Sequence, residues 1–256
     1  MTGLLAGKRL LITGVLTEAS IAFHTAKHAQ EQGADVVLTG FGRLSLVQRV
    51  ANRLPRPAPV VELDVQDATH LDTLAARVRD HTDRLDGVLH AIGFAPPSCL
   101  GAPFLDSPRE DVSVAIEVSA FSFKSLVVAV KPLLGPGAAI VGLNFDGQAA
   151  WPAYNWMGVA KAALECVNRY LARDLGRDGI RVNLVTAGPL RTVAASAIPG
   201  FTGLEEGWTA RAPLGWNAAD PGPVARTVCA VLSDWLPATT GSLIAADGGV
   251  LALAPV

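Results

Sequence analysis

The sequence predicts an α/β protein built on one doubly wound parallel sheet of about seven strands. Short runs rich in β-branched residues alternate with helix-length segments along the whole chain. The runs are continuously apolar instead of alternating, as in strands that helices cover on both faces. The 256 residues are 50% hydrophobic and 17% charged, which suffices for one large core. We therefore expect a single domain over residues 1–256.

The expected strands and helices alternate in order. Strands are expected at 10–14, 35–40, 59–65, 87–94, 138–145, 180–188 and 242–249. Helices are expected at 20–33, 43–53, 68–83, 109–132, 152–175 and 220–234. Short right-handed crossovers follow from that order. The Pro- and Gly-rich segments 95–108 and 188–223 each follow a strand and are expected to be loops, hence candidate pocket walls.

Composition excludes several classes of function. The net charge of -2 and the lack of a basic run argue against a nucleic-acid partner, which needs clustered cations to displace counterions from phosphates. Cys99, Cys166 and Cys229 are widely spaced and form no C-x-x-C pair, as in reduced cytoplasmic thiols. No run reaches the 18 apolar residues of a membrane span, and the start lacks the apolar segment of a signal peptide. We expect a soluble, cytoplasmic protein with a small-molecule ligand.

The turn after the first expected strand is a candidate dinucleotide-phosphate site. A strand, a glycine turn and a helix start present free backbone N–H groups to a pyrophosphate, as in Rossmann folds. Here Gly14 is followed by Ser20 and Ile21 at the helix start, and the usual G-x-G-x-x-G is absent. The alternative is that Ser20 serves only as an N-cap, and the two interpretations are compatible.

The next two strand ends suggest the adenosine end of the same ligand. Phe41 is placed to stack on adenine, and Arg43 either pairs with a 2′-phosphate or is a solvated residue at a helix start. No acidic residue follows the second strand to bind an NAD ribose, so NADH and NADPH both remain open. Asp64 and Val65 close the third strand, where Asp64 either binds adenine or serves as a turn residue.

Tyr154 and Lys161 are seven residues apart in the stretch AYNWMGVAKAALE at 153–165. On a helix, seven residues rotate through about 700°, so the two side chains share a face about 10.5 Å apart along the axis. They can converge on a nicotinamide ribose and an adjacent carbonyl, with Lys161 on the ribose and Tyr154 donating its O–H. The alternative is an amphipathic helix with an interfacial Tyr and a snorkelling Lys.

The sequence gives little support for a metal site or a hydrolase site. His24 and His28 have the i, i+4 spacing of metal ligands, but Thr25 replaces the Glu of H-E-x-x-H and no third ligand is evident. We expect no metal site. No G-x-S-x-G motif of an α/β-hydrolase occurs.

These motifs resemble a known family, the short-chain dehydrogenases. Met157 and Val141 stand where the carbonyl-reducing members have the Tyr of Tyr-x-x-x-Lys and a Ser. The divergent branch, enoyl-acyl-carrier-protein reductase, has instead Tyr-x6-Lys, a first loop ending Ser-Ile-Ala, and Ile-Gly-Phe after the fourth strand. All three are present, at 154–161, 20–22 and 92–94. The likeness spans essentially the whole chain and is greatest to the actinobacterial, mycobacterial-like members.

The resemblance implies NADH-dependent reduction of trans-2-enoyl thioesters, with NADPH possible. Tyr154 would stabilise the enolate, Lys161 would bind the cofactor ribose, and Phe145 would hold the position of a second Tyr in many bacterial relatives. The substrate side would include Tyr154, Phe145, Ala95 and Met157. Together with Lys161, the residues matching cofactor-contacting positions are Gly14, Ser20, Ile21, Phe41, Asp64, Val65, Ile92, Gly93, Leu190 and Thr192.

The resemblance also implies partners and two departures. The substrate would arrive on acyl carrier protein, an acidic partner that some of Arg43, Arg191 and Arg211 would guide. The protein would be a homotetramer whose apolar C-terminal run, GGVLALAPV at 248–256, packs on another subunit. Ala91 replaces a frequent Ser, which predicts weaker cofactor binding. The substrate-binding loop, at about 189–215, is shorter than in mycobacterial members, which predicts shorter acyl chains. The alternatives are an NADPH-dependent 3-oxoacyl reductase and a non-catalytic dinucleotide-binding protein.

Overall fold

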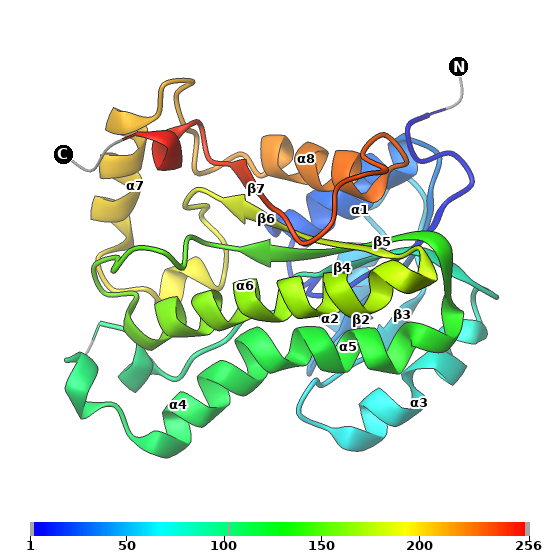
Figure 1. Ribbon diagram of the computed structural model, residues 1–256, viewed down its shortest axis with the longest axis horizontal. Helices are drawn as coiled ribbons and strands as arrows, with labels where there is room; N and C mark the ends of the chain where they lie inside the picture. Colours follow the sequence, from blue (N-terminus) through cyan, green and yellow to red (C-terminus); the bar gives the residue numbers. More distant parts are fainter. Residues whose placement is uncertain (1–2, 102, 254–256) are drawn as a thin grey trace.

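The computed structural model describes residues 3–101 and 103–253 and contains a seven-stranded parallel sheet within them (Figure 1). The strand order is β3-β2-β1-β4-β5-β6-β7, so the topological switch point lies between β1 and β4. The strands are β1 (Arg9–Ile12), β2 (Asp35–Gly40), β3 (Val60–Glu62), β4 (Leu85–His90), β5 (Leu134–Asn144), β6 (Arg181–Ala187) and β7 (Leu243–Ala246). The prediction of a doubly wound parallel sheet is confirmed.

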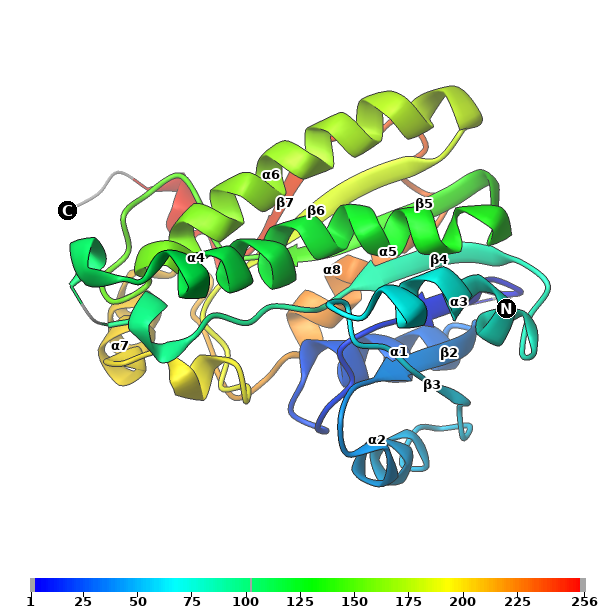
Figure 2. The ribbon, with the colours of Figure 1, turned by 90° about the horizontal axis from the view of Figure 1, so that it is seen from below.

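Helices cover both faces of this sheet. The helices are α1 (Ile21–Glu31), α2 (Leu44–Ala51), α3 (Ala68–Arg79), α4 (Arg109–Ile116), α5 (Ser122–Val130), α6 (Asn155–Leu175), α7 (Phe201–Arg211) and α8 (Gly222–Leu232). In Figure 1, α1 and α8 lie above the sheet and α5 and α6 below it, and Figure 2 shows α3, α5 and α6 along that lower face. α7 stands beyond the carboxyl ends of the strands, at the left of Figure 1.

Each strand contributes to two separate cores because its side chains alternate between the faces. Leu10 and Ile12 pack with α1 and α8, whereas Leu11 between them packs with α3, α5 and α6. All three are at most 1% exposed. Because both faces of each strand are buried, the strands are continuously apolar in sequence.

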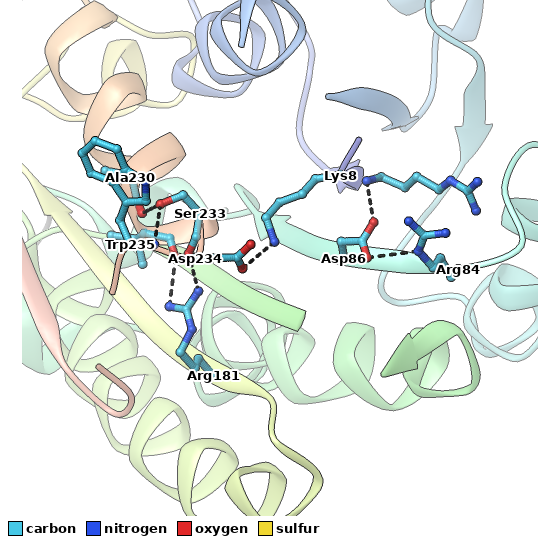
Figure 3. A network of polar contacts seen from close by, with 10 residues as sticks. Lys8, Arg84, Asp86, Arg181, Ala230, Ser233, Asp234 and Trp235 are labelled. Atoms are coloured by element: carbon cyan, nitrogen blue, oxygen red, sulfur yellow. Dashed lines mark hydrogen bonds and ion pairs between the residues drawn. The ribbon is translucent and has the colours of Figure 1, made fainter. Parts of the chain in front are cut away.

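A network of polar contacts holds the amino ends of the strands, opposite to α7 (Figure 3). The guanidinium of Arg181 at the start of β6 donates to the carbonyls of Val231 (3.1 Å) and Ser233 (2.6 Å) at the end of α8. Lys8 forms an ion pair with Asp234 at 2.7 Å. Burial lowers the pKa of Arg181. These contacts satisfy carbonyls that the helix end leaves without an intrahelical partner.

Three predicted elements differ from the structure. The helix expected at 109–132 is interrupted by a π-helical turn, Glu117–Phe121, between α4 and α5. The helix expected at 152–175 begins at Asn155, so Tyr154 precedes it. The segment 188–223, expected to be a loop, contains α7. The strand predictions were right in number and order but often extended into the following loops.

One helical run of described residues, Arg109–Leu133, has the length and apolar composition of a membrane span. Its most apolar window is 44% buried inside the fold, where Phe123 and Leu126 pack beneath the sheet. A helix of this kind is typical of a protein core. Packing on another subunit was expected for the C-terminal run at 248–256, of which residues 254–256 lie outside the described residues.

Candidate functional site

The start of α1 forms an open helix N-terminus at the carboxyl end of β1. Ser20 is the N-cap, with extended backbone, and its Oγ accepts the Phe23 N–H at 3.1 Å. The N–H groups of Ile21 and Ala22 have no intrahelical acceptor because they belong to the first turn. The positive end of the helix dipole and these donors suit a phosphate group. The N-cap role of Ser20 is thus observed, and its hydroxyl also donates to the Thr17 carbonyl at 2.7 Å, so the backbone N–H groups are the donors left for a ligand.

Of two glycines near this helix start, one has no room for a side chain and the other leaves room for neighbouring groups. Gly14 has a φ of 74°, and a Cβ there would lie 2.0 Å from the Ala91 carbonyl oxygen, so the turn after β1 touches the end of β4. Gly93 is exposed, and a Cβ there would lie 4.0 Å from Lys161 Nζ and 3.8 Å from Ser119 Oγ. The absence of a side chain at Gly93 therefore leaves open the space in front of the lysine.

The π-helical turn positions the loop that contains Gly93. Ser119 Oγ accepts the Phe94 N–H at 2.9 Å and donates to the Phe94 carbonyl at 2.8 Å. Ser122 Oγ donates to the Val118 carbonyl at 2.6 Å and lies 2.8 Å from His90 Nε2. Since π-bulges widen a helix locally, they often occur at functional sites. Sequence analysis missed these two serines, because an apolar helical pattern continues through the bulge.

The side chains expected at the adenosine end lie at the ends of β2 and β3. Phe41 is 59% exposed, as is suitable for stacking on a base, and Arg43 beside it is exposed. Asp64 Oδ1 accepts the Gln66 N–H at 2.9 Å, so Asp64 does serve as a turn residue. Asp64 and Val65 are half-buried. They occupy the edge of the sheet that also carries Gly14.

Tyr154 is buried, 7% exposed, in a strained turn at the start of α6. Its neighbours Ala153 and Asn155 have φ values of 60° and 42°, which non-glycine residues rarely adopt. The Tyr154 carbonyl accepts the Met157 N–H at 3.0 Å, as an N-cap carbonyl does. Burial raises the pKa of Tyr154, so its O–H stays protonated as a hydrogen-bond donor. The strain is concentrated at the residue for which chemistry was predicted.

Lys161 is also buried, 8% exposed, on α6. Its Nζ donates to the Leu143 carbonyl at 3.0 Å. Burial lowers the pKa of Lys161 to about 8, and the charge of Glu165 acts in the opposite direction. An ammonium has three donors, so two of them are available toward the open space at Gly93. This arrangement contradicts the alternative of a snorkelling surface lysine.

The four residues predicted for the substrate side fall in one apolar cluster. Ala95, Tyr154 and Met157 are its buried members, and Phe145 packs against them. The Phe145 ring lies 5.0 Å from the Tyr154 ring, between centroids, and 5.6 Å from the Trp208 ring. Trp208 belongs to α7, a helix that was not predicted, so α7 contacts the substrate-side cluster through Phe145.

A cavity of about 400 Å³ adjoins this cluster. It lies between α7 and the 151–153 segment and is lined mainly by apolar groups, including Trp151, Ile198, Gly203, Gly207 and Trp208. The rings of Trp151 and Trp208 lie 5.2 Å apart, and their indole N–H groups are held by Asp146 and the Asp247 carbonyl. A larger cavity of about 450 Å³ lies at the other end of the sheet, near Arg9 and Arg56. Proximity to Tyr154 makes the smaller cavity the better candidate for a substrate.

Leu190 and Thr192 have structural contacts of their own. The Leu190 side chain is 4% exposed in the core, so only its backbone can reach a ligand. Thr192 Oγ1 accepts the Ala195 N–H at 3.2 Å. Arg191 between them pairs with Glu205 of α7 through two contacts, at 2.9 and 2.7 Å. The arginine expected to guide a carrier protein is therefore a brace between the loop and α7.

The described residues contain no group of three or more His, Cys, Asp and Glu side chains placed to hold a metal ion. The His24 and His28 rings lie 6.4 Å apart, and His28 Nδ1 lies 2.9 Å from Glu31 Oε2. The three cysteines are free.

Comparison with known proteins gives consistent matches. The profile of the family described as "Enoyl-(Acyl carrier protein) reductase" matches residues 14–251. The chain is 59% identical to an enoyl-[acyl-carrier-protein] reductase [NADH] of Mycolicibacterium smegmatis, over 97% of this chain and 98% of the relative. It is 56% identical to that of Mycobacterium avium, with the same coverage, and 35% identical to that of Escherichia coli, over 96% and 95% of the two chains.

Proposed function

Because the chain belongs to the enoyl-acyl-carrier-protein reductase family, we propose that Tyr154 acts on the substrate and Lys161 on the cofactor in an NADH-dependent reaction. The chain is an oxidoreductase that reduces enoyl-acyl-carrier-protein thioesters in fatty acid synthesis, with NADH as cofactor. The observation that supports the division of roles is the burial of both side chains at the carboxyl edge of the sheet.

The proposed reaction is a conjugate reduction. NADH, when bound, would supply a hydride to C3 of a trans-2-enoyl thioester. As the C2=C3 π pair becomes a C1=C2 bond and the carbonyl π pair moves onto the thioester oxygen, the protonated Tyr154 hydroxyl donates a hydrogen bond to that oxygen. C2 afterwards takes a proton from Tyr154 or water. The raised pKa of Tyr154 suits this role, because a neutral O–H donates whereas a phenolate does not.

The chain's residues fit a dinucleotide along this edge. The free N–H groups at the start of α1 suit the pyrophosphate, and the open space at Gly93 leads to Lys161 Nζ. In the proposal, Lys161 donates to ribose hydroxyls while the Leu143 carbonyl keeps its amine in place. Phe41, Asp64 and Val65 bind the adenosine end. The remaining proposed contacts are Gly14, Ser20, Ile21, Ile92, Leu190 and Thr192.

The acyl chain is proposed to enter the 400 Å³ cavity beside Phe145 and Tyr154. In this assignment the chain is one catalytic domain whose substrate-binding loop, about 189–215, contains α7. The cavity is at the small end of ligand sites, which run from about 300 to 1,000 Å³. This size supports the proposal that short or medium acyl chains are preferred.

We further propose a cytoplasmic homotetramer whose substrate is presented by acyl carrier protein. Three free cysteines, of which Cys99 and Cys229 are buried, suit a reducing compartment. Exposed apolar side chains on the π-helical turn, α5 and α6, namely Phe121, Val128 and Tyr170, support association between copies. Of the three arginines proposed for carrier recognition, Arg43 is exposed and follows β2 near the proposed adenosine end, whereas Arg191 is paired with Glu205.

A direct assay tests the reaction. Purified protein is mixed with trans-2-dodecenoyl thioester and NADH, then NADPH, and the absorbance of the reduced nicotinamide is followed. Oxidation of NADH is expected. Oxidation only with a 3-oxoacyl substrate and NADPH would indicate a carbonyl reductase instead, and no turnover of either substrate would indicate a dinucleotide-binding protein without catalysis.

A further inference from the structure

Glu165 is a buried carboxylate on the helix of the proposed cofactor lysine. It is 6% exposed and follows Lys161 by four residues, so the two side chains lie on one face of α6 one turn apart. Burying a carboxylate is costly unless it is paired and hydrogen-bonded. The groups that contact this carboxylate therefore indicate the role of its buried charge.

The two hydrogen bonds of Glu165 reach the last residue of β5 and the loop that follows it. Its Oε1 accepts the Asn144 side-chain N–H at 2.9 Å and the Gly147 backbone N–H at 3.1 Å. The same Asn144 nitrogen lies 3.3 Å from Thr186 Oγ1 on β6. Gly147 has no room for a side chain, because a Cβ would lie 2.6 Å from the Ala162 nitrogen. Glu165 thus fastens α6 to the 144–147 segment, which contains Phe145.

No salt bridge to Glu165 occurs among the described residues, and the ammonium that shares its face of α6 is Lys161. Other titratable groups near this lysine are less suited to stabilise it. His90 at the end of β4 is neutral, and Lys161 helps to lower its pKa to about 3. Asp146 is bonded to Trp151 and Gln148, Glu117 is bonded to Gln66, and Tyr154 is protonated.

We propose that Glu165 is a positioning residue that keeps Lys161 charged and in place for the cofactor, while it anchors the segment that contains Phe145. The proposal rests on the cofactor role assigned to Lys161. The negative charge of Glu165 is needed because burial disfavours the ammonium form of Lys161, and the carboxylate opposes this effect. Glu165 thus acts on the reaction through Lys161 and does not itself contact the substrate.

The test is Glu165→Gln, which keeps the shape and the oxygen acceptor but removes the charge. The dissociation constant of NADH is measured from pH 6 to 9. At pH 6 the dissociation constant of NADH for the variant is expected to lie within about twofold of the parent's. As the pH rises, the variant is expected to begin losing affinity for NADH at a pH about one unit lower than the parent does. Glu165→Asp, which keeps the charge, is expected to restore the parent's pH profile. A Gln variant with an unchanged profile would overturn the proposal.

A second measurement reads Lys161 without cofactor. The chain has five lysines, so the titration of Lys161 can be resolved by NMR of labelled apo protein, with Lys161→Met identifying the signal. A lower pKa in Glu165→Gln is expected, and an unchanged one contradicts the proposal. If the Glu165→Gln variant does not fold, folding is measured in the double variant Glu165→Gln with Lys161→Met. Recovery of folding supports the charge pairing, since the buried ammonium is gone, and failure of both variants indicates a purely structural Glu165.

The proposed function fails in a different way. If Lys161→Met binds NADH as tightly as the parent, the role of Lys161 is wrong. If Lys161→Met loses NADH but Glu165→Gln keeps the parent's profile, only the inference about Glu165 is wrong.

Discussion

The ring of Phe145 lies edge-on to the ring of Tyr154, with centroids 5.0 Å apart and an interplanar angle of 66°. Phe145 has no polar group, so it contributes shape and a low dielectric around the tyrosine hydroxyl but no proton. The chain has two tyrosines, and Tyr154 is the buried one while Tyr170 is 57% exposed. Proton donation by a tyrosine in this cluster therefore depends on Tyr154.

Replacing Tyr154 by Phe is expected to lower kcat by about 10²–10³, the usual cost of one preorganised donor to an oxyanion. The dissociation constant of NADH should change less than threefold. Tyr170→Phe, at an exposed position of α6, is the matched control and should retain full activity. Stopped-flow measurement of NADH oxidation gives both constants. Full activity in the Tyr154→Phe variant would mean that water or another group stabilises the charge.

Lys161 should make the stability of the apo protein depend on alkaline pH. Its pKa falls from 10.5 to about 8 on folding, so between these values the unfolded chain holds more of this proton than the folded one. The free energy of unfolding therefore rises with pH in this window. Relative to Lys161→Met, which does not titrate, the parent should gain on the order of 3 kcal/mol from pH 8 to 10.5. Urea unfolding at several pH values measures the difference, and parallel curves for the two proteins would contradict it.

His90 should make the stability of the protein depend on pH in the acidic range. It is fully buried and its pKa is lowered from 6.5 to about 3, chiefly by burial. Below pH 6.5 the unfolded chain takes up a proton that the folded one refuses, so stability is lost as the pH falls toward 3. His90→Gln keeps an N–H donor for Ser122 and should remove up to about 1.4 kcal/mol of this loss per pH unit. His81→Gln, at an exposed position, is the control and should follow the parent.

The sheet and the edge that holds the site were predictable from sequence because the signals are local. Continuous apolar runs mark buried parallel strands, and the strand, turn and helix around Gly14 indicated a phosphate site at their carboxyl ends. Lys161 was predicted from its spacing to Tyr154 and Gly93 from the family resemblance, and in the structure Lys161 Nζ lies 4.0 Å from a Cβ built on Gly93.

The missed features depend on contacts between distant segments. α7 contains Gly203 and Gly207, which lower helix propensity, and Trp208 is its one buried residue, so no apolar period reveals it. The turn at Tyr154 requires positive φ at Asn155 and also at Ala153, where alanine rarely adopts it. Tertiary packing decides both, and the wall that Trp208 forms beside Phe145 was therefore invisible in the sequence.

Two glycines of α7 line the cavity proposed for the acyl chain, and this arrangement gives a test of chain-length preference. Gly203 and Gly207 lie one turn apart on the same face, and a Cβ at either would meet no atom within 4 Å. The side chain introduced by Gly207→Leu would occupy that space, and the change also raises helix propensity, so lost activity would not reflect an unfolded α7.

Turnover is compared on C4, C8, C12 and C16 enoyl thioesters. The parent is expected to prefer chains shorter than C16, and Gly207→Leu should lower kcat/KM for C12 about 10–100-fold relative to C4, the cost of mismatch in an apolar pocket. Thr202→Leu adds bulk on an exposed position of α7 that does not line the cavity and should leave the order unchanged. A parent maximum at C16 would contradict the short-chain preference. An unchanged ratio of kcat/KM for C12 to that for C4 in the Gly207→Leu variant would show that the acyl chain binds elsewhere. The leucine would fill the cavity, so a C12 chain that still binds equally well could not occupy it.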